Sequence, residues 1–157
     1  MSNITQENKI ALLIEDDENG LTRAINAARS QNLSDALNCY VNPDLTWKWV
    51  KSFEEFTQYI VQNGLPHILA FDHDLGGNSY DLWHKHKGYK GNNINYDEYD
   101  EPTGYHCAKW LTTYCQDNKL KLECEVHAHS MNVKGRENII AILDNFKKFQ
   151  EKYGTES

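Results

Sequence analysis

Two short segments of the chain are almost entirely apolar, and each ends abruptly in a polar, acidic run. Residues 10–14 read IALLI and are followed by EDDE at 15–18, and residues 67–71 read HILAF and are followed by DHD at 72–74. A short apolar run without alternation is typical of a strand that is buried on both faces. Such strands occur in parallel sheets covered by helices on both sides, so these two runs predict an α/β protein.

The rest of the chain alternates between helical and strand patterns. Apolar side chains at helical spacing predict helices over 20–31, 53–63, 104–117 and 136–150, with a weaker helical turn over 34–40. Period-two alternation predicts two further strands, over 45–50 and 121–128. Four strands that are each followed by a helix predict a parallel sheet with crossover connections.

Size and charge limit the possible functions. A chain of 157 residues is expected to form a single domain over 1–157. Sixteen basic against 23 acidic residues give a formal net charge of −7, which disfavours duplex nucleic acid as a partner. The longest aliphatic run is far shorter than the ~20 residues of a membrane helix, and the polar start has no signal-peptide core. We therefore expect neither membrane insertion nor secretion.

The four cysteines show no CxxC spacing. They are Cys39, Cys107, Cys115 and Cys124. We interpret them as buried thiols of a reducing compartment, rather than as zinc ligands or disulfides.

Residues 76–101 form a long insertion between the third strand and the following helix. The segment lacks a clear periodicity, is rich in Gly, Asn, Tyr and His, and is too long for a simple connection. We expect a functional loop or lid. Its tyrosines Tyr80, Tyr89, Tyr96 and Tyr99 have two possible roles, because they could stack on a nucleobase or pack onto one another.

Polar clusters follow three of the predicted strands, at 15–17, 72–74 and 127–130. Ligand sites of parallel α/β sheets lie beyond the carboxyl ends of the strands, so we expect one shared site. Crowded carboxylates repel one another, and a divalent cation neutralises them. Asp16, Asp17 and Asp72 are the predicted metal ligands. Taken alone, the first two could instead cap a helix, and a histidine could bond a backbone carbonyl in the core.

These residue types predict metal-assisted phosphate chemistry, with Mg²⁺ or Mn²⁺ as the expected ion. His127 and His129 are the candidate general acid and base, and Asp74 is expected to act beside them by orienting water or completing the metal shell. The groups expected to bind the phosphate ligand are His73, Ser130, Asn132, Lys134 and Arg136, helped by the N–H groups that open the last helix. The predicted function is a metal-dependent phosphoesterase acting on a small nucleotide or cyclic phosphate. The alternative is a non-catalytic module that binds or sequesters a nucleotide or a partner protein.

The order of the polar groups resembles that of receiver domains in two-component response regulators. Acids follow the first strand, Asp72 follows the third and Ser130 follows the fourth. The resemblance implies a doubly wound, flavodoxin-like sheet with strand order 2-1-3-4, Mg²⁺ on the first acids and a phosphoryl group on Asp72. A receiver continues to a fifth strand ending in Lys-Pro and a fifth helix. No Lys-Pro pair occurs here, so we expect a receiver type without its last strand and helix, and the missing lysine weakens a signalling role in which Asp72 is phosphorylated.

A more specific resemblance rests on six motifs. They are LLIEDD at 12–17, FDHDLG at 71–76, TGY at 103–105, KWL at 109–111 and HAHSMN at 127–132, with GR at 135–136. Together they are similar to the cyclic-phosphate processing receiver-like family of phage and bacterial proteins, over about residues 10–145. The resemblance implies a cyclic phosphate as the substrate class and a cytoplasmic location, in a bacterial cell or a phage-infected host.

Overall fold

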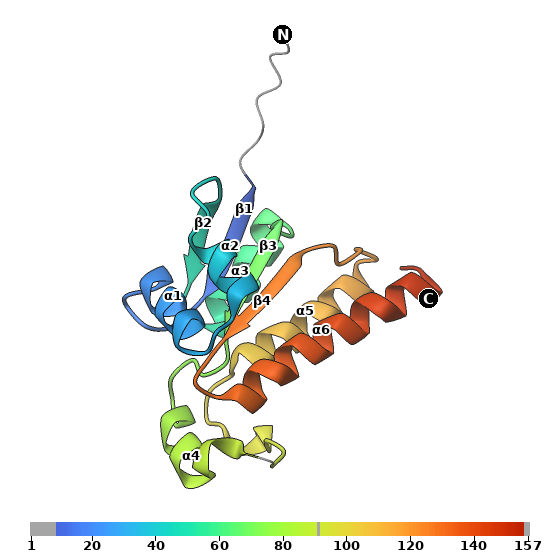
Figure 1. Ribbon diagram of the computed structural model, residues 1–157. Coiled ribbons are helices and arrows are strands. Elements are labelled where there is room, and N and C mark those ends of the chain that lie inside the picture. Colours follow the sequence, from blue (N-terminus) through green and yellow to red (C-terminus); the bar gives the residue numbers. More distant parts are fainter. Residues whose placement is uncertain (1–8, 91, 156–157) are drawn as a thin grey trace.

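The computed structural model describes residues 9–90 and 92–155, and within these ranges one parallel sheet of four strands forms the centre of the molecule (Figure 1). The strand order is β2-β1-β3-β4, as predicted. The strands are β1 (Ile10–Ile14), β2 (Thr46–Val50), β3 (Ile68–Asp72) and β4 (Glu125–His129). The helices are α1 (Leu21–Ser30), α2 (Ser34–Tyr40), α3 (Phe53–Asn63), α4 (Ser79–Lys85), α5 (Gly104–Asp117) and α6 (Val133–Tyr153), with short 3₁₀ turns η1 (Lys87–Tyr89) and η2 (Tyr96–Glu98).

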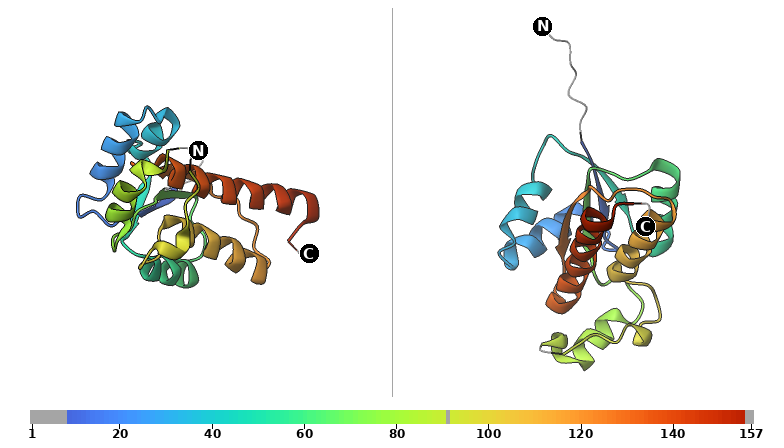
Figure 2. Two further views of the ribbon diagram at one scale, coloured as in Figure 1. Left: turned by 90° about the horizontal axis from the view of Figure 1, so that it is seen from below. Right: turned by 90° about the vertical axis from the view of Figure 1, so that its right-hand side faces the viewer.

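The alternation of side chains along the strands divides the core into two layers. Leu12 of β1 and Phe71 of β3 belong to the layer that α3, α5 and α6 cover. Their neighbours Leu13 and Ala70 belong to the layer that α1 and α2 cover, where Tyr40 is the largest buried side chain. The helices lie on both sides of the sheet (Figure 2). The doubly wound, receiver-type architecture is therefore confirmed.

Two predicted starting residues differ from the structure by three residues or more, and α6 also ends three residues later than predicted, at Tyr153. Strand β4 begins at Glu125 rather than at 121, because its first pairing partner on β3 is Ile68, the first residue of that strand. Helix α6 begins at Val133 rather than at 136, because the Asn132 side chain accepts a hydrogen bond from the Gly135 N–H at 2.9 Å and so caps the helix. No helix in the described ranges has the length and hydropathy that crossing a membrane requires.

The insertion has more regular structure than its composition suggested, since it contains α4, η1 and η2. It projects beyond the carboxyl ends of the strands (Figures 1 and 2). The two proposed roles for its tyrosines apply to different members of the set. Tyr96 stacks on Tyr105 with ring centroids 4.3 Å apart, and the hydroxyls of Tyr99 and Tyr89 are hydrogen-bonded, whereas Tyr80 is 69% exposed. Tyr80 is thus the one of these four that remains available to a ligand.

Candidate functional site

The alternation of side chains brings three polar groups to one place at the ends of the strands. Glu15 lies two residues beyond Leu13, and Asp72 two residues beyond Ala70, so both side chains point toward the layer of α1 and α2. Asp72 also pairs in register with His129 of β4. Glu15, Asp72 and His129 each offer a ligand atom within 4.8 Å of the other two, which is a spacing that fits one metal ion.

Hydrogen bonds fix the orientation of this cluster. Glu15 and His129 are each 1% exposed, and His129 Nε2 lies 3.2 Å from Glu15 Oε1. The other ring nitrogen, Nδ1, lies 2.9 Å from the hydroxyl of Tyr40. Burial raises the pKa of Tyr40 well above its usual value, so the phenol stays neutral and donates to Nδ1. Nε2–H is then left to donate to Glu15.

The two carboxyl groups of the cluster differ in ionisation. Burial alone would raise the pKa of Glu15, but hydrogen bonds from His129 and Asp72 outweigh it and lower the pKa. Burial, and then the charge of Glu15, raise the pKa of Asp72 well above its usual value. Without a cation, Asp72 therefore holds a proton that it donates to Glu15. A divalent ion would replace that proton, because it neutralises both carboxylates at once.

A pocket of about 400 Å³ opens beside the cluster. Five carboxylates face it, against the single guanidinium of Arg23, so its field favours a cation. Side chains of the insertion form the opposite wall. The pocket is lined by Glu15, Asp16, Asp17, Arg23, Asp72, Asp74, Gly76, Gly77, Ser79, Tyr80, Trp83, His84, Ser130 and Met131.

Asp16 and Asp17 both line this pocket, and neither caps α1. The N-cap of that helix is Gly20, with no side-chain hydrogen bond, and Asp17 accepts a bond from the N–H of Asn19 at 2.8 Å. Burial, followed by the charge of Glu15, raises the pKa of Asp16 to about 6. The crowding of negative charge therefore extends to the rim of the pocket.

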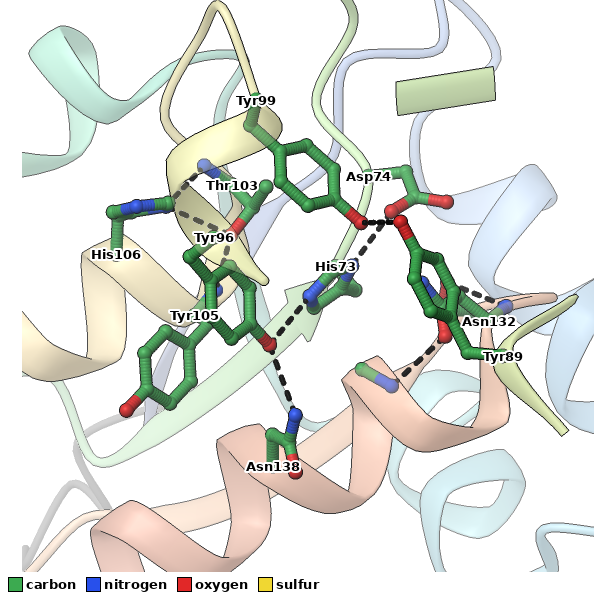
Figure 3. Close-up of polar contacts among 12 residues, drawn as sticks. His73, Asp74, Tyr89, Tyr96, Tyr99, Thr103, Tyr105, His106, Asn132 and Asn138 are labelled. Carbon is green, nitrogen blue, oxygen red and sulfur yellow. Dashed lines mark hydrogen bonds and ion pairs between the residues drawn. The ribbon is translucent and has the colours of Figure 1, made fainter. Parts of the chain in front are cut away.

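His73 has the opposite orientation to its neighbours and is completely buried. Its Nδ1 lies 2.6 Å from Asp74 Oδ1, and its Nε2 lies 2.9 Å from the hydroxyl of Tyr96 (Figure 3). Asn138 of α6 donates to that same hydroxyl at 3.1 Å. His73, which the sequence suggested as a ligand-binding residue, thus has no surface for a ligand. It holds the Asp74 carboxylate in place at the pocket.

Two glycines allow helices α5 and α6 to approach this region closely. The N–H of Gly104 donates to the His73 carbonyl at 2.7 Å, and a Cβ at Gly104 would overlap the carbonyl oxygen of Asp72. A Cβ at Gly135 would overlap the ring of His73. The glycines of the TGY and GR motifs therefore allow the backbones of α5 and α6 to lie close to the DHD segment at 72–74.

His127 lies away from the pocket. It shares a face with His129, and both rings contact Tyr40, with centroids 6.3 and 5.5 Å from it. His127 precedes His129 by two residues on β4, which places it about 6–7 Å farther from the carboxyl edge of the sheet. Its Nε2 is instead 2.7 Å from Glu125. The structure therefore does not bring His127 to the site that the sequence predicted for it.

The predicted phosphate-binding residues of the last motif also separate. Ser130 lines the pocket, and its hydroxyl accepts a hydrogen bond from the backbone N–H of Asn132 at 3.0 Å. Asn132 is completely buried as the cap of α6. Arg136 lines a different and larger cavity of about 590 Å³, between α2, β4 and α6. Lys134 lines neither of the two.

Sequence reasoning missed several residues of this site. Glu15 was seen within the acidic run but not taken as a ligand, although counting by twos from Leu13 would have selected it. Tyr40 and Arg23 carry no local signal, because their positions depend on how α1 and α2 pack on the sheet. Trp83 lies in a segment whose helix was not predicted.

The family model described as the cyclic-phosphate processing receiver domain matches residues 11–145. The chain belongs to this family. A search of curated proteins finds no match. One solved structure, described as a yeast Spc42 trimeric coiled coil fused to another structure, is similar at 12% sequence identity and a TM-score of 0.43. The match covers 98% of this chain and 89% of that one, and with this TM-score it carries no argument about function.

Proposed function

We propose that this protein is a metal-dependent phosphoesterase that acts on a small nucleotide or cyclic phosphate. The observation that carries the proposal is the cluster of Glu15, Asp72 and His129 at the edge of an acidic pocket with an aromatic wall. Membership of a family described by cyclic-phosphate processing is consistent with that substrate class.

The residues at the carboxyl edge fit a divalent cation. Carboxylates suit Mg²⁺, and an imidazole among them also suits Mn²⁺. Asp72 and Glu15 would hold the ion, and Asp16 at the rim is placed to complete its shell. Once bound, the cation would polarise a phosphoryl oxygen and offset the negative charge that otherwise repels a phosphate from this pocket.

The other pocket residues would position the substrate and the attacking water. Ser130 can donate its hydroxyl hydrogen to a phosphate oxygen, and Arg23 can pair with the phosphate charge. Asp74, whose side chain is 22% exposed and held by His73, is placed to accept a proton from water. His129 has both ring nitrogens engaged within the protein, so we assign it to orienting Glu15 rather than to proton transfer.

The wall formed by α4 fits a nucleobase. Tyr80 and His84 lie with ring centroids 4.3 Å apart, and Trp83 and His84 with centroids 5.0 Å apart. All three rings line the pocket that the carboxylates face. Stacking on an aromatic side chain contributes about 1–3 kcal/mol per base. Replacing Tyr80 by Ala should therefore raise KM for a nucleotide roughly 5–150-fold and leave KM for a base-free cyclic phosphate unchanged.

Asp72→Asn tests the proposed reaction. Hydrolysis of a panel of cyclic and linear nucleotides is measured with Mg²⁺, Mn²⁺ or Zn²⁺ after removal of metal by a chelator, and metal binding is measured by calorimetry. We expect the variant to lose both metal binding and turnover. The matched control is Asp144→Asn, an exposed acid on α6 that should retain both.

Two results would contradict the proposal. Equal turnover by the Asp72 variant and the control would show that the metal site takes no part in the reaction. Tight nucleotide binding by the wild type with no turnover under any of the three metals would favour a binding module instead.

A further inference from the structure

A second cluster of metal-binding groups lies on the same face of the sheet, nearer the amino ends of the strands. Cys39 of α2 and two residues of β4, Glu125 and His127, each offer a ligand atom within 4.8 Å of the other two. The cluster has no residue in common with Glu15, Asp72 and His129. We propose that it is a zinc site, separate from the acidic pocket.

The three donor types favour zinc over the ions expected at the acidic pocket. A thiolate, an imidazole and a carboxylate are the ligands that Zn²⁺ takes in proteins, at about 2.3, 2.0 and 2.1 Å. Tetrahedral geometry at those lengths places the donor atoms about 3.2–3.8 Å apart. His127 Nε2 and Glu125 Oε2 are now 2.7 Å apart, so they need to separate by only about an ångström to admit the ion.

Burial gives the cluster a closed side and an open side. Cys39 is buried and the His127 side chain is only 13% exposed, whereas the Glu125 side chain is 60% exposed. A metal could enter past Glu125 without any rearrangement of the core. Three protein ligands leave a fourth position for water or another ligand, as in zinc sites that are not purely structural. His127 also lines the cavity between α2, β4 and α6.

The location explains what the ion would do for the fold. Strand β4 is the edge of the described sheet and pairs with β3 alone. An ion held by Cys39 and His127 would join this edge strand to α2. The cysteines were expected to be buried thiols, and all four are free and buried. Cys39 differs from the others in that a histidine and a carboxylate reach it.

Cobalt provides a test that distinguishes this site from the acidic pocket. Co²⁺ bound to a thiolate gives a charge-transfer absorption in the near ultraviolet, and the Glu15 cluster contains no sulfur. Chelator-treated protein titrated with Co²⁺ should develop this band to one equivalent, and Zn²⁺ should abolish it. The band should disappear in Cys39→Ser. It should persist in Cys124→Ser, where a hydroxyl can keep the hydrogen bond that the thiol makes to the Pro66 carbonyl at 3.0 Å.

A second variant covers the case in which Cys39→Ser fails to fold. Glu125 is exposed, so Glu125→Gln should leave the fold intact. It should lower zinc affinity at least about tenfold, because losing even a residue that only hydrogen-bonds to a metal ligand typically lowers metal affinity about 10–100-fold. Zinc should also raise the Tm of the wild type by more than that of Cys39→Ser, in which only the acidic pocket can still bind an ion. Absence of the cobalt band, its persistence in Cys39→Ser, or an unchanged affinity in Glu125→Gln would overturn the proposal.

Discussion

Replacement of Gly135 by Ala tests whether the close approach of α6 to His73 holds the site together. A methyl group at this position would lie 2.6 Å from Nδ1 of His73 and 2.5 Å from Cδ2, well inside van der Waals contact. The ring cannot retreat freely, because Asp74 and Tyr96 hold its two nitrogens at 2.6 and 2.9 Å. The substitution therefore forces either a shift of α6 or the loss of these bonds.

The magnitude follows from opposing contributions. Alanine is favoured over glycine within a helix by about 1 kcal/mol. Overpacking a closed site costs about 1–3 kcal/mol. Losing the bond to Asp74 adds about 1.5–3 kcal/mol and the bond to Tyr96 about 1 kcal/mol. We expect a net loss of about 2.5–6 kcal/mol, which for a chain of this length lowers Tm by roughly 5–24 °C.

The assay is urea unfolding of four proteins: the wild type, Gly135→Ala, His73→Ala and the double variant. Without the imidazole, the methyl group has space, so Gly135→Ala should be neutral or stabilising by up to about 1 kcal/mol in the His73→Ala background. The coupling energy of the cycle should therefore be several kcal/mol. An equal loss in both backgrounds, or a Gly135→Ala protein more stable than the wild type, would refute the reasoning.

Three further predictions concern the acidic pocket. Because the pKa of Asp16 rises to about 6 on folding from about 4 in the unfolded chain, its contribution to stability is present below pH 4 and is lost as the pH rises through 6. In chelator, Asp16→Asn should therefore gain stability over the wild type between pH 4 and 7. The gain should be only about 1 kcal/mol, because Asp16 is partly exposed at the rim of the pocket and solvent screens its charge. A difference in unfolding free energy that stays constant from pH 4 to 7 in urea unfolding would contradict this prediction. Tyr40→Phe removes the hydrogen-bond donor to His129 Nδ1. Calorimetry should therefore show a metal affinity about 10–100-fold lower than that of the wild type. An unaltered affinity would exclude a positioning role for the phenol. In Gly104→Ala the added methyl group would overlap the backbone carbonyl of Asp72, and no side-chain movement relieves this overlap. Circular dichroism should therefore show loss of the native fold. A native spectrum with the wild-type Tm would contradict the close approach of α5 to Asp72.

Much of the fold could be predicted because strand and helix patterns are local. The apolar runs at 10–14 and 67–71 identify central strands, and their polar ends identify the edge at which ligands bind. The SFEE segment at 52–55 has the pattern of a capping box and so predicts the start of α3. The structure shows the Ser52 half of it, because Ser52 accepts from the Glu55 N–H at 3.1 Å, whereas the Glu55 side chain accepts from the N–H of Lys51. The boundaries of β4 and α6 were less accurate, because pairing with Ile68 and the Asn132 cap decide them.

Sequence by itself also determined which side chains share a face, because alternation along a strand is a property of the backbone. It placed Asp72 opposite to His73, and His127 on the same side as His129. Only the tertiary structure decided how near these groups come to one another. The end of β1 brings Glu15 to Asp72, whereas α2 brings Cys39 to His127, because the distance between elements is set by how helices pack on the sheet and not by any local pattern.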